Sequence, residues 1–137
     1  MRRDEVRTPK AHVYDRSGKG LNASQELIVS QVGPGSRVLE FGPAYGAITR
    51  ELTVERDCRV IGVELDPAGA EATARWAERV FVGDIEAYDW LEDLREERFD
   101  FVLCADVIEH LFDPWRFVER AATLLARGGR VVISVPN

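Results

Sequence analysis

A glycine-rich stretch at positions 40–46 has the residue types and spacing of a ligand-binding turn. Its residues are Glu40, Phe41, Gly42, Pro43, Ala44, Tyr45 and Gly46. Before it stands the apolar pair Val38 and Leu39, typical of a buried parallel strand, and after it comes a helical pattern with Ile48 and Leu52 four positions apart. Glycines let backbone approach a ligand, and a helix start offers unpaired N–H groups. We therefore expect a small polar ligand over residues 42–46.

The identity of two residues bears on which ligand this turn would take. In the dinucleotide-binding pattern G-x-G-x-x-G/A, the second glycine lets the backbone approach a pyrophosphate closely, and here that position is Ala44. An acid at Glu40 would repel phosphates and could hold a cationic amino group instead. A pyrophosphate becomes a poorer fit without being excluded. A glycine turn without any ligand remains an alternative.

The same residues resemble motif I of the class I S-adenosylmethionine-dependent methyltransferases, commonly written E/D-x-G-x-G-x-G. Glu40, Gly42 and Gly46 match the acid and the outer glycines, whereas Ala44 replaces the middle glycine. The resemblance covers residues 35–137 and implies an S-adenosylmethionine cofactor held by the whole turn, Pro43, Ala44 and Tyr45 included. Its implied partner is a small-molecule methyl acceptor. The sulfonium is already an activated leaving group, so the lack of a catalytic dyad does not argue against such an enzyme.

Two later strand-like runs end in acids that suit a nucleoside. Glu64 closes the run at 59–64, and an acid at that place in nucleotide-binding α/β folds accepts hydrogen bonds from ribose hydroxyls. Helix capping is the alternative role for Glu64, and more so for Asp66. The resemblance implies that Asp84 accepts a hydrogen bond from the adenine amino group, that Ile85 packs on the ring, and that Leu65 also contacts the cofactor.

The segment 106–111 resembles the part that many family members carry beside the transferred methyl group. The resemblance places Ala105 and Asp106 at the cofactor and makes His110 the candidate catalytic residue, because an imidazole with a pKa of about 6.5 can act as general base toward a hydroxyl. Some methyltransferases of quinone precursors or small-RNA 2′-hydroxyls hold a divalent metal with E-x-x-E-H here. This chain has the shorter Asp106 before Glu109 and His110, so no metal is expected. Two alternatives remain: the three residues bind a metal, or His110 has a purely structural role.

Strand-like and helical patterns alternate along the rest of the chain. This order predicts an α/β, Rossmann-like, doubly wound parallel sheet of five strands with helices on both faces, an incomplete class I methyltransferase fold. Every candidate ligand residue then falls at the carboxyl end of a strand, where open α/β sheets bind ligands. The expected strands are 38–41, 59–64, 79–82, 99–105 and 130–135; the expected helices are 22–32, 47–52, 67–76, 86–98 and 114–125, with residues 126–129 ending the last helix.

Length and composition predict a single cytoplasmic domain. The 137 residues contain no apolar run of the roughly 18 residues that a membrane helix needs, and a net charge of −6 argues against nucleic acid. Residues 1–21 are expected to form a polar arm, in which His12 and Tyr14 could reach a ligand, and residues 22–137 the S-adenosylmethionine-binding domain. Cys58 and Cys104 lie in apolar surroundings that suit buried, reduced thiols.

The family fold usually continues beyond a fifth strand with segments that form much of the acceptor pocket. Because the sequence ends at Asn137, we expect a truncated fold with a reduced acceptor site and an apolar sheet edge open to self-association. Two other functions compete with the methyltransferase. A nicotinamide-dependent oxidoreductase half-domain is disfavoured by Ala44 and Glu40, and a non-catalytic cofactor-binding module would keep the fold without the chemistry.

Overall fold

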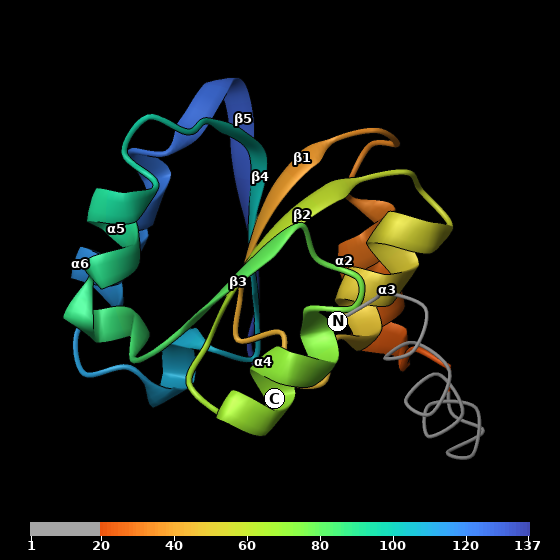
Figure 1. The fold of residues 1–137 in the computed structure, drawn as a ribbon, viewed down its shortest axis with the longest axis horizontal. Helices are drawn as coiled ribbons and strands as arrows, with labels where there is room; N and C mark the ends of the chain where they lie inside the picture. Colours follow the sequence, from red (N-terminus) through yellow and green to blue (C-terminus); the bar gives the residue numbers. More distant parts are fainter. Residues whose placement is uncertain (1–19) are drawn as a thin grey trace.

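Five parallel strands form a sheet with helices on both faces (Figure 1). The computed structural model describes residues 20–137. The strand order is β3-β2-β1-β4-β5, so the chain starts in the middle, runs outward to one edge and then crosses to the other half. The predicted fold class is confirmed. The strands are β1 (Arg37–Phe41), β2 (Arg59–Glu64), β3 (Arg79–Val82), β4 (Phe99–Ala105) and β5 (Leu125–Ser134).

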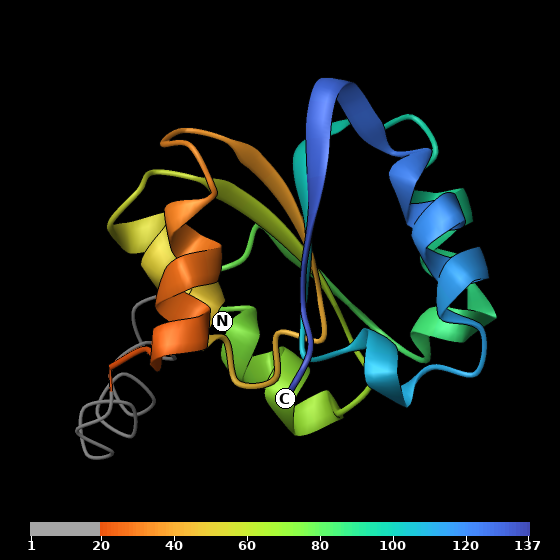
Figure 2. The same cartoon turned by 180° about the vertical axis from the view of Figure 1, so that it is seen from behind.

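The helices divide between the two faces of the sheet. Figures 1 and 2 show α2 (Ala23–Ser30) and α3 (Ala47–Val54) on one face, with α5 (Asp89–Asp93) and α6 (Pro114–Ala122) on the other. Helix α4 (Pro67–Thr73) packs against β2 and β3. Two short 3-10 helices, η1 (Ile85–Ala87) and η2 (Ile108–His110), follow β3 and β4. Within the described residues, no helix has the length and apolarity needed to cross a bilayer.

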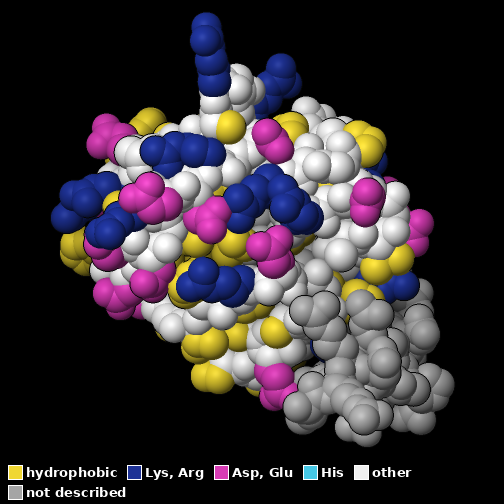
Figure 3. All heavy atoms as spheres, turned by 45° about the horizontal axis from the view of Figure 1, so that its top comes forward, with side chains coloured by type: hydrophobic (Ala, Val, Ile, Leu, Met, Phe, Trp, Pro, Cys, Tyr) yellow, Lys and Arg dark blue, Asp and Glu magenta, His cyan; other side chains and the backbone are white. Residues whose placement is uncertain are grey.

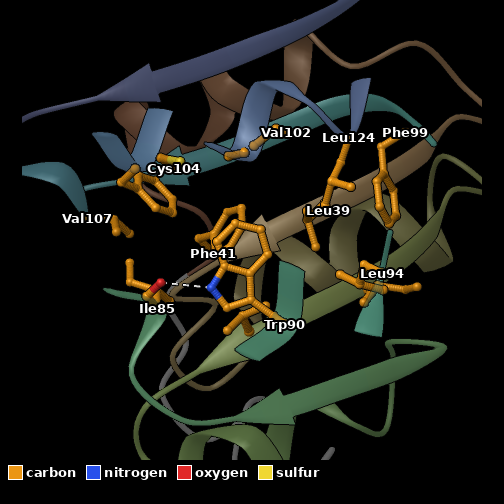
Figure 4. Packing of buried hydrophobic residues seen from close by; sticks show 14 residues of the cluster. Leu39, Phe41, Ile85, Trp90, Leu94, Phe99, Val102, Cys104, Val107 and Leu124 are labelled. Atoms are coloured by element: carbon orange, nitrogen blue, oxygen red, sulfur yellow. Dashed lines mark hydrogen bonds between the residues drawn. The ribbon is translucent and has the colours of Figure 1, made fainter. Parts of the chain in front are cut away.

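Each face of the sheet has its own apolar core, and one of them extends to the carboxyl ends of the strands. On the α5/α6 face, the Phe41 ring packs edge-on against the rings of Trp90 and Phe117, with centroid distances of 4.7 and 4.8 Å. Figure 4 shows Ile85 and Val107 at one end of this cluster, where the Ile85 carbonyl accepts a hydrogen bond from Trp90 Nε1 at 2.8 Å. The residues that follow β3 and β4 are therefore anchored in the core.

Both cysteines are buried and unpaired, as predicted from the sequence. Burial raises the pKa of the Cys104 thiol to about 12, with a smaller contribution from the carboxyl group of Glu40. A thiol with so high a pKa is protonated at neutral pH and unreactive.

The helix predicted over 86–98 is wrong. The structure has η1 and the short α5 instead, separated by Tyr88, whose φ of 62° lies in the left-handed region. A residue in that conformation cannot continue a right-handed helix. The Tyr88 ring lies under the guanidinium groups of Arg116 and Arg120 at 5.5 and 5.6 Å, so contacts with α6 accompany the break.

The boundary between α6 and β5 also differs from the prediction. Helix α6 ends at Ala122, and β5 begins at Leu125, so residues 126–129 lie inside the strand rather than at a helix end. Its pairing with β4 is irregular between Phe99 and Phe101. A Cβ on Gly129 would lie 2.9 Å from the Phe99 carbonyl oxygen, so the glycine allows the two backbones to approach at this irregularity.

The amino-terminal ends of the strands carry both charge signs. Figure 3 shows Arg side chains in dark blue between the magenta side chains of Asp and Glu on this face. At the start of β1, the Arg37 guanidinium lies 2.6 Å from the Glu97 carboxylate and over the Phe99 ring. The charges on this face are therefore interspersed and partly paired.

Candidate functional site

The carboxyl ends of β1 and β4 are neighbours in the sheet, although helices and two other strands separate them in the sequence. From β1 the chain turns toward β2, and from β4 it turns toward β5, so connections leave this point in opposite directions. Ligands of open α/β sheets bind in the crevice that such a reversal creates. The glycine turn after β1 and the segment 106–110 after β4 both lie there.

The turn at 42–46 has a backbone that requires glycine at two positions. Gly42 has φ +64°, and a Cβ there would stand 2.8 Å from Val107 Cγ2 in the segment after β4. Gly46 has φ +85°, and a Cβ there would stand 3.0 Å from the backbone of Thr73 in α4. Both glycines combine a left-handed backbone with close packing against a neighbouring segment. The outer glycines of the predicted motif are therefore explained by this geometry.

Ala44 occupies the middle position of the turn with φ +52°. This conformation costs a residue with a Cβ roughly 1–2 kcal/mol, which is why a glycine suits the position. Two hydrogen bonds hold the residue there: its N–H donates to Glu64 Oε1 at 2.6 Å, and its carbonyl accepts from Thr73 Oγ1 at 3.0 Å. The side chains of β2 and α4 thus maintain a turn that Ala44 does not favour by itself.

Glu40 is the most unusual carboxyl group of the site. It is 2% exposed, and the Thr49 hydroxyl in α3 donates a hydrogen bond to its Oε1. Burial raises its pKa from 4.5 to about 7; the bond from Thr49 opposes this rise, and the nearby Glu64 carboxylate adds to it. A buried acid with such a pKa can exist in either protonation state near neutral pH.

Glu64 links the glycine turn to the start of α4. It is 8% exposed, and its two carboxylate oxygens accept hydrogen bonds from Ala44 N at 2.6 Å and Asp66 N at 2.9 Å. Asp66 caps α4 through a bond from Ala68 N at 3.1 Å, which confirms the capping alternative for Asp66. A carboxylate has about four lone-pair sites, so Glu64 retains acceptor capacity for a ribose hydroxyl beside these two bonds.

The residues predicted to contact an adenine differ in exposure. Asp84 is exposed and accepts a hydrogen bond from Glu86 N at 2.9 Å, capping η1. Ile85 is 9% exposed and belongs to the apolar core. By contrast, Leu65 is 67% and Tyr45 55% exposed, so two large side chains stand in solvent at this edge of the sheet. Such an edge provides apolar surface and a carboxylate together, as a purine requires.

The segment after β4 is fixed at its first residue and open at its last. Asp106 has φ +54°; its N–H donates to the Ser134 carbonyl at 3.1 Å, and its Oδ1 accepts from Ser134 Oγ at 3.1 Å. The His110 side chain is 77% exposed, with Nε2 3.6 Å from Glu109 Oε1. Among residues 20–137, no three metal-ligating side chains come together, so Asp106, Glu109 and His110 are not assembled as a ligand set here.

Residues 15–137 match the methyltransferase domain family. The chain belongs to this family. The ubiquinone biosynthesis O-methyltransferase of Nitrobacter winogradskyi is 28% identical over 138 residues, covering 100% of this chain and 49% of that protein. The chain spans about half the length of the curated relatives it matches. The resemblance inferred from the glycine turn is thereby confirmed at the level of the family.

Solved methyltransferase structures share the fold. A TehB-like SAM-dependent methyltransferase from Corynebacterium glutamicum superposes with a TM-score of 0.68 at 21% identity, over 96% of this chain and 73% of that chain. The N-terminal domain of EvdMO1, crystallised with SAH and D-fucose, gives a TM-score of 0.65 at 25% identity, over 84% of this chain and 51% of that chain. The methyltransferase domain thus has the architecture predicted from its sequence.

Substituting Ala44 by glycine should stabilise this methyltransferase domain. Relief of the left-handed conformation gains roughly 1–2 kcal/mol, and the greater freedom of glycine in the unfolded chain takes back roughly 0.4–1 kcal/mol. We expect a free energy of unfolding up to about 1.5 kcal/mol higher in urea titration. Ala68→Gly, at an exposed helical position, should lose stability instead. A less stable Ala44→Gly protein would show that Ala44 is not strained.

Several residues that hold the candidate site in place were missed by the sequence reasoning. Thr49 and Thr73 bond Glu40 and Ala44, and Glu86 accepts hydrogen bonds from the N–H groups of Phe112 and Asp113 at 2.8 and 2.9 Å. Such polar residues in helices carry no sequence signal for these bonds. Gly69 did have one, since a glycine within the alanine-rich α4 indicates a close approach of another segment. The predicted His12 and Tyr14 lie outside the described residues.

Proposed function

We propose that this chain is the cofactor-binding part of an S-adenosylmethionine-dependent methyltransferase that acts on a small molecule. The observation that carries the proposal is the convergence of the motif I turn, Glu64 and Asp84 at the carboxyl ends of three neighbouring strands. Membership of the methyltransferase family supports it. The name of the relative from Nitrobacter winogradskyi, an O-methyltransferase, supports a hydroxyl group as the methyl acceptor.

The residues of the site fit this cofactor. Gly42 and Gly46 let the turn pack closely against Val107 and Thr73, which keeps it at the carboxyl end of β1. Leu65 offers uncovered apolar surface, and the carboxylate of Asp84 is exposed at the end of the neighbouring strand. In this proposal the turn 42–46 binds the amino acid tail, Glu40 balances its ammonium charge, and Glu64 accepts from the ribose. The remaining contacts are Asp84 with the adenine amino group, Ile85 and Leu65 with the ring, and Ala105 and Asp106 beside the methyl group.

The bound cofactor would supply a methyl group on a positively charged sulfur, already activated for transfer. The task of the protein is then to hold the acceptor oxygen in line with that carbon and to exclude competing water. His110 lies on the segment after β4, and its side chain is exposed, so an acceptor could reach it without a rearrangement of the core. We assign it the role of taking the proton from the acceptor hydroxyl. No metal takes part in this proposal.

Calorimetry with S-adenosylhomocysteine tests the cofactor assignment. We expect binding to the wild type and an affinity roughly ten-fold lower for Asp84→Asn, because the adenine amine loses a charged acceptor worth about 1.4 kcal/mol. Asp113→Asn is the matched control, since Asp113 is also an exposed helix-capping aspartate but caps α6. No binding to a folded sample at millimolar ligand, or equal losses in both variants, would contradict the proposal.

A thermal-shift comparison with NADH separates the methyltransferase from the oxidoreductase that the sequence left open. S-adenosylhomocysteine should raise the unfolding temperature and NADH should not, because Ala44 and Glu40 oppose a pyrophosphate. Ligand binding without turnover in the full-length protein would instead favour a non-catalytic module.

Four other expectations from the sequence stay predictions. They are a cytoplasmic location, the polar arm at 1–21, the absence of nucleic-acid and membrane partners, and self-association through β5.

A further inference from the structure

We propose that Glu40 carries a proton in a large fraction of ligand-free molecules at neutral pH and releases it when the cofactor binds, so that one buried carboxyl group sets the pH dependence of cofactor affinity. The inference rests on the proposed function, because it assumes that the cationic tail of the cofactor lies over the motif I turn. It concerns the protonation state of this carboxyl group, which the shape of the turn alone does not determine.

The position of Glu40 isolates it from water and from positive charge. It is the penultimate residue of β1, between Gly62 of β2 and Leu103 of β4 in the sheet, and it is 2% exposed. The one hydrogen bond found for its side chain within residues 20–137 comes from the Thr49 hydroxyl of α3. A carboxylate in such a place lacks the solvation and the pairing that its charge requires.

The titratable groups around Glu40 also favour the neutral form. From β2, the Glu64 carboxylate raises the pKa of Glu40; from β4, Cys104 has a thiol pKa of about 12 and is neutral; from α3, Thr49 is the only influence that lowers the pKa of Glu40. Within the described part of the chain, no arginine or histidine is among the groups that act on it. The balance places the pKa of Glu40 at about 7.

A cationic ligand beside this group reverses the balance. S-adenosylmethionine and S-adenosylhomocysteine both carry an α-ammonium group, and a positive charge within about 4–6 Å of a carboxylate lowers its pKa by roughly 1–3 units. On binding, the O–H bond of the Glu40 carboxyl breaks, the proton passes to the buffer, and the carboxylate left behind neutralises the ammonium. No other reactant is needed.

The size of the effect follows from the pKa of about 7. At pH 6 roughly ten in eleven ligand-free molecules are protonated at Glu40, and at pH 8 roughly one in eleven. If the ligand binds the carboxylate form, the affinity contributed by this group rises about ten-fold from pH 6 to pH 8. Near pH 7, binding releases about half a proton from Glu40.

The first experiment compares wild type with Glu40→Gln by calorimetry with S-adenosylhomocysteine at pH 6, 7 and 8. At pH 7, two buffers with different ionisation enthalpies report the number of protons released. Because the amino group of the ligand and any histidine titrate in both proteins alike, the difference between the proteins isolates Glu40. We expect the wild type to gain about ten-fold more affinity over this range than the variant, and to release about half a proton more.

A second variant and a second ligand keep the test decisive if Glu40→Gln binds nothing. Thr49→Val removes the hydrogen bond that lowers the pKa of Glu40, so the rise in affinity should move to higher pH. A purely structural loss would weaken binding equally at every pH. The ligand 5′-methylthioadenosine has the adenosine and the thioether but no amino acid, and it should bind to the wild type without the extra proton release.

The outcomes separate this inference from the function on which it rests. Binding at every pH, with the same pH dependence in wild type and Glu40→Gln or with no shift in Thr49→Val, overturns the proton release and leaves the cofactor assignment intact. Absence of S-adenosylhomocysteine binding at every pH in all folded samples overturns the cofactor assignment, and the proton release with it.

Discussion

Replacing Glu40 by glutamine is expected to stabilise the ligand-free domain at pH 8. The change in the free energy of unfolding caused by the substitution should be about 3 kcal/mol more favourable at pH 8 than at acid pH. Folding raises the pKa of Glu40 from 4.5 to about 7, a change equivalent to about 3 kcal/mol. The neutral group suits the buried site, so its contribution is fully present below pH 4.5 and is lost as the pH rises through 7. The glutamine variant keeps the acceptor oxygen for Thr49 and does not ionise.

Urea titrations at pH 5, 6, 7 and 8 measure this difference. The free energy of unfolding of the wild type should fall relative to that of Glu40→Gln between pH 5 and 8, while Glu119→Gln, an exposed carboxyl on α6, should run parallel to the wild type. Parallel curves for wild type and Glu40→Gln would mean that Glu40 is solvated in solution. The comparison needs no ligand, so it is independent of the calorimetric experiment.

The energetics of Glu40 give a physical reason for placing an acid there. In the ligand-free state an ionised Glu40 opposes folding. Among residues 20–137, the groups that act on its pKa include no cation that could compensate its charge. Residues that lower stability are retained in proteins chiefly where function uses them. A ligand with an ammonium group would supply the missing charge. In our proposal the same carboxyl group links the stability of the domain to its affinity for the cofactor, and makes both depend on pH.

The sequence was sufficient to locate three of the five strands. The bounds of β2, β3 and β4 agree with the predicted 59–64, 79–82 and 99–105, because short apolar runs between polar segments have few alternatives. It was insufficient where tertiary contacts override local preference. The break at Tyr88 accompanies contacts with α6, and the glycines at 128 and 129 read as a helix end although they belong to an irregular part of β5.

The same division holds within the candidate site. The places of Glu40, Gly42 and Gly46 follow from one contiguous motif and were predicted. The bonds that give them their properties join separate segments: Thr49 to Glu40, Thr73 to Ala44, and Glu64 to Ala44. A threonine in a helix has no feature that reveals a partner in a distant strand. The raised pKa of Glu40 likewise depends on burial, which a single sequence does not specify residue by residue.

Gly69→Ala should decide how firmly α4 determines the shape of the motif I turn. A Cβ on Gly69 would lie 2.6 Å from the Ala44 carbonyl oxygen and 3.2 Å from its carbonyl carbon. These are backbone atoms, and the same carbonyl oxygen already accepts the hydrogen bond from Thr73. The turn or the helix must therefore move. An extra methyl group in such a contact costs roughly 1–3 kcal/mol.

Helix propensity acts in the opposite direction, since alanine is about 1 kcal/mol more favourable than glycine inside a helix. We expect the collision to prevail, with a net loss of up to about 2 kcal/mol in urea titration. The affinity for S-adenosylhomocysteine should be roughly ten-fold lower, because the displaced Ala44 carbonyl belongs to the turn that we propose binds the ligand. Ala68→Gly in the same helix measures propensity without the collision, and should cost at most about 1 kcal/mol and leave ligand affinity unchanged. A Gly69→Ala protein more stable than wild type, with unchanged affinity, would mean that α4 and the turn separate freely and that Thr73 does not fix the conformation of Ala44.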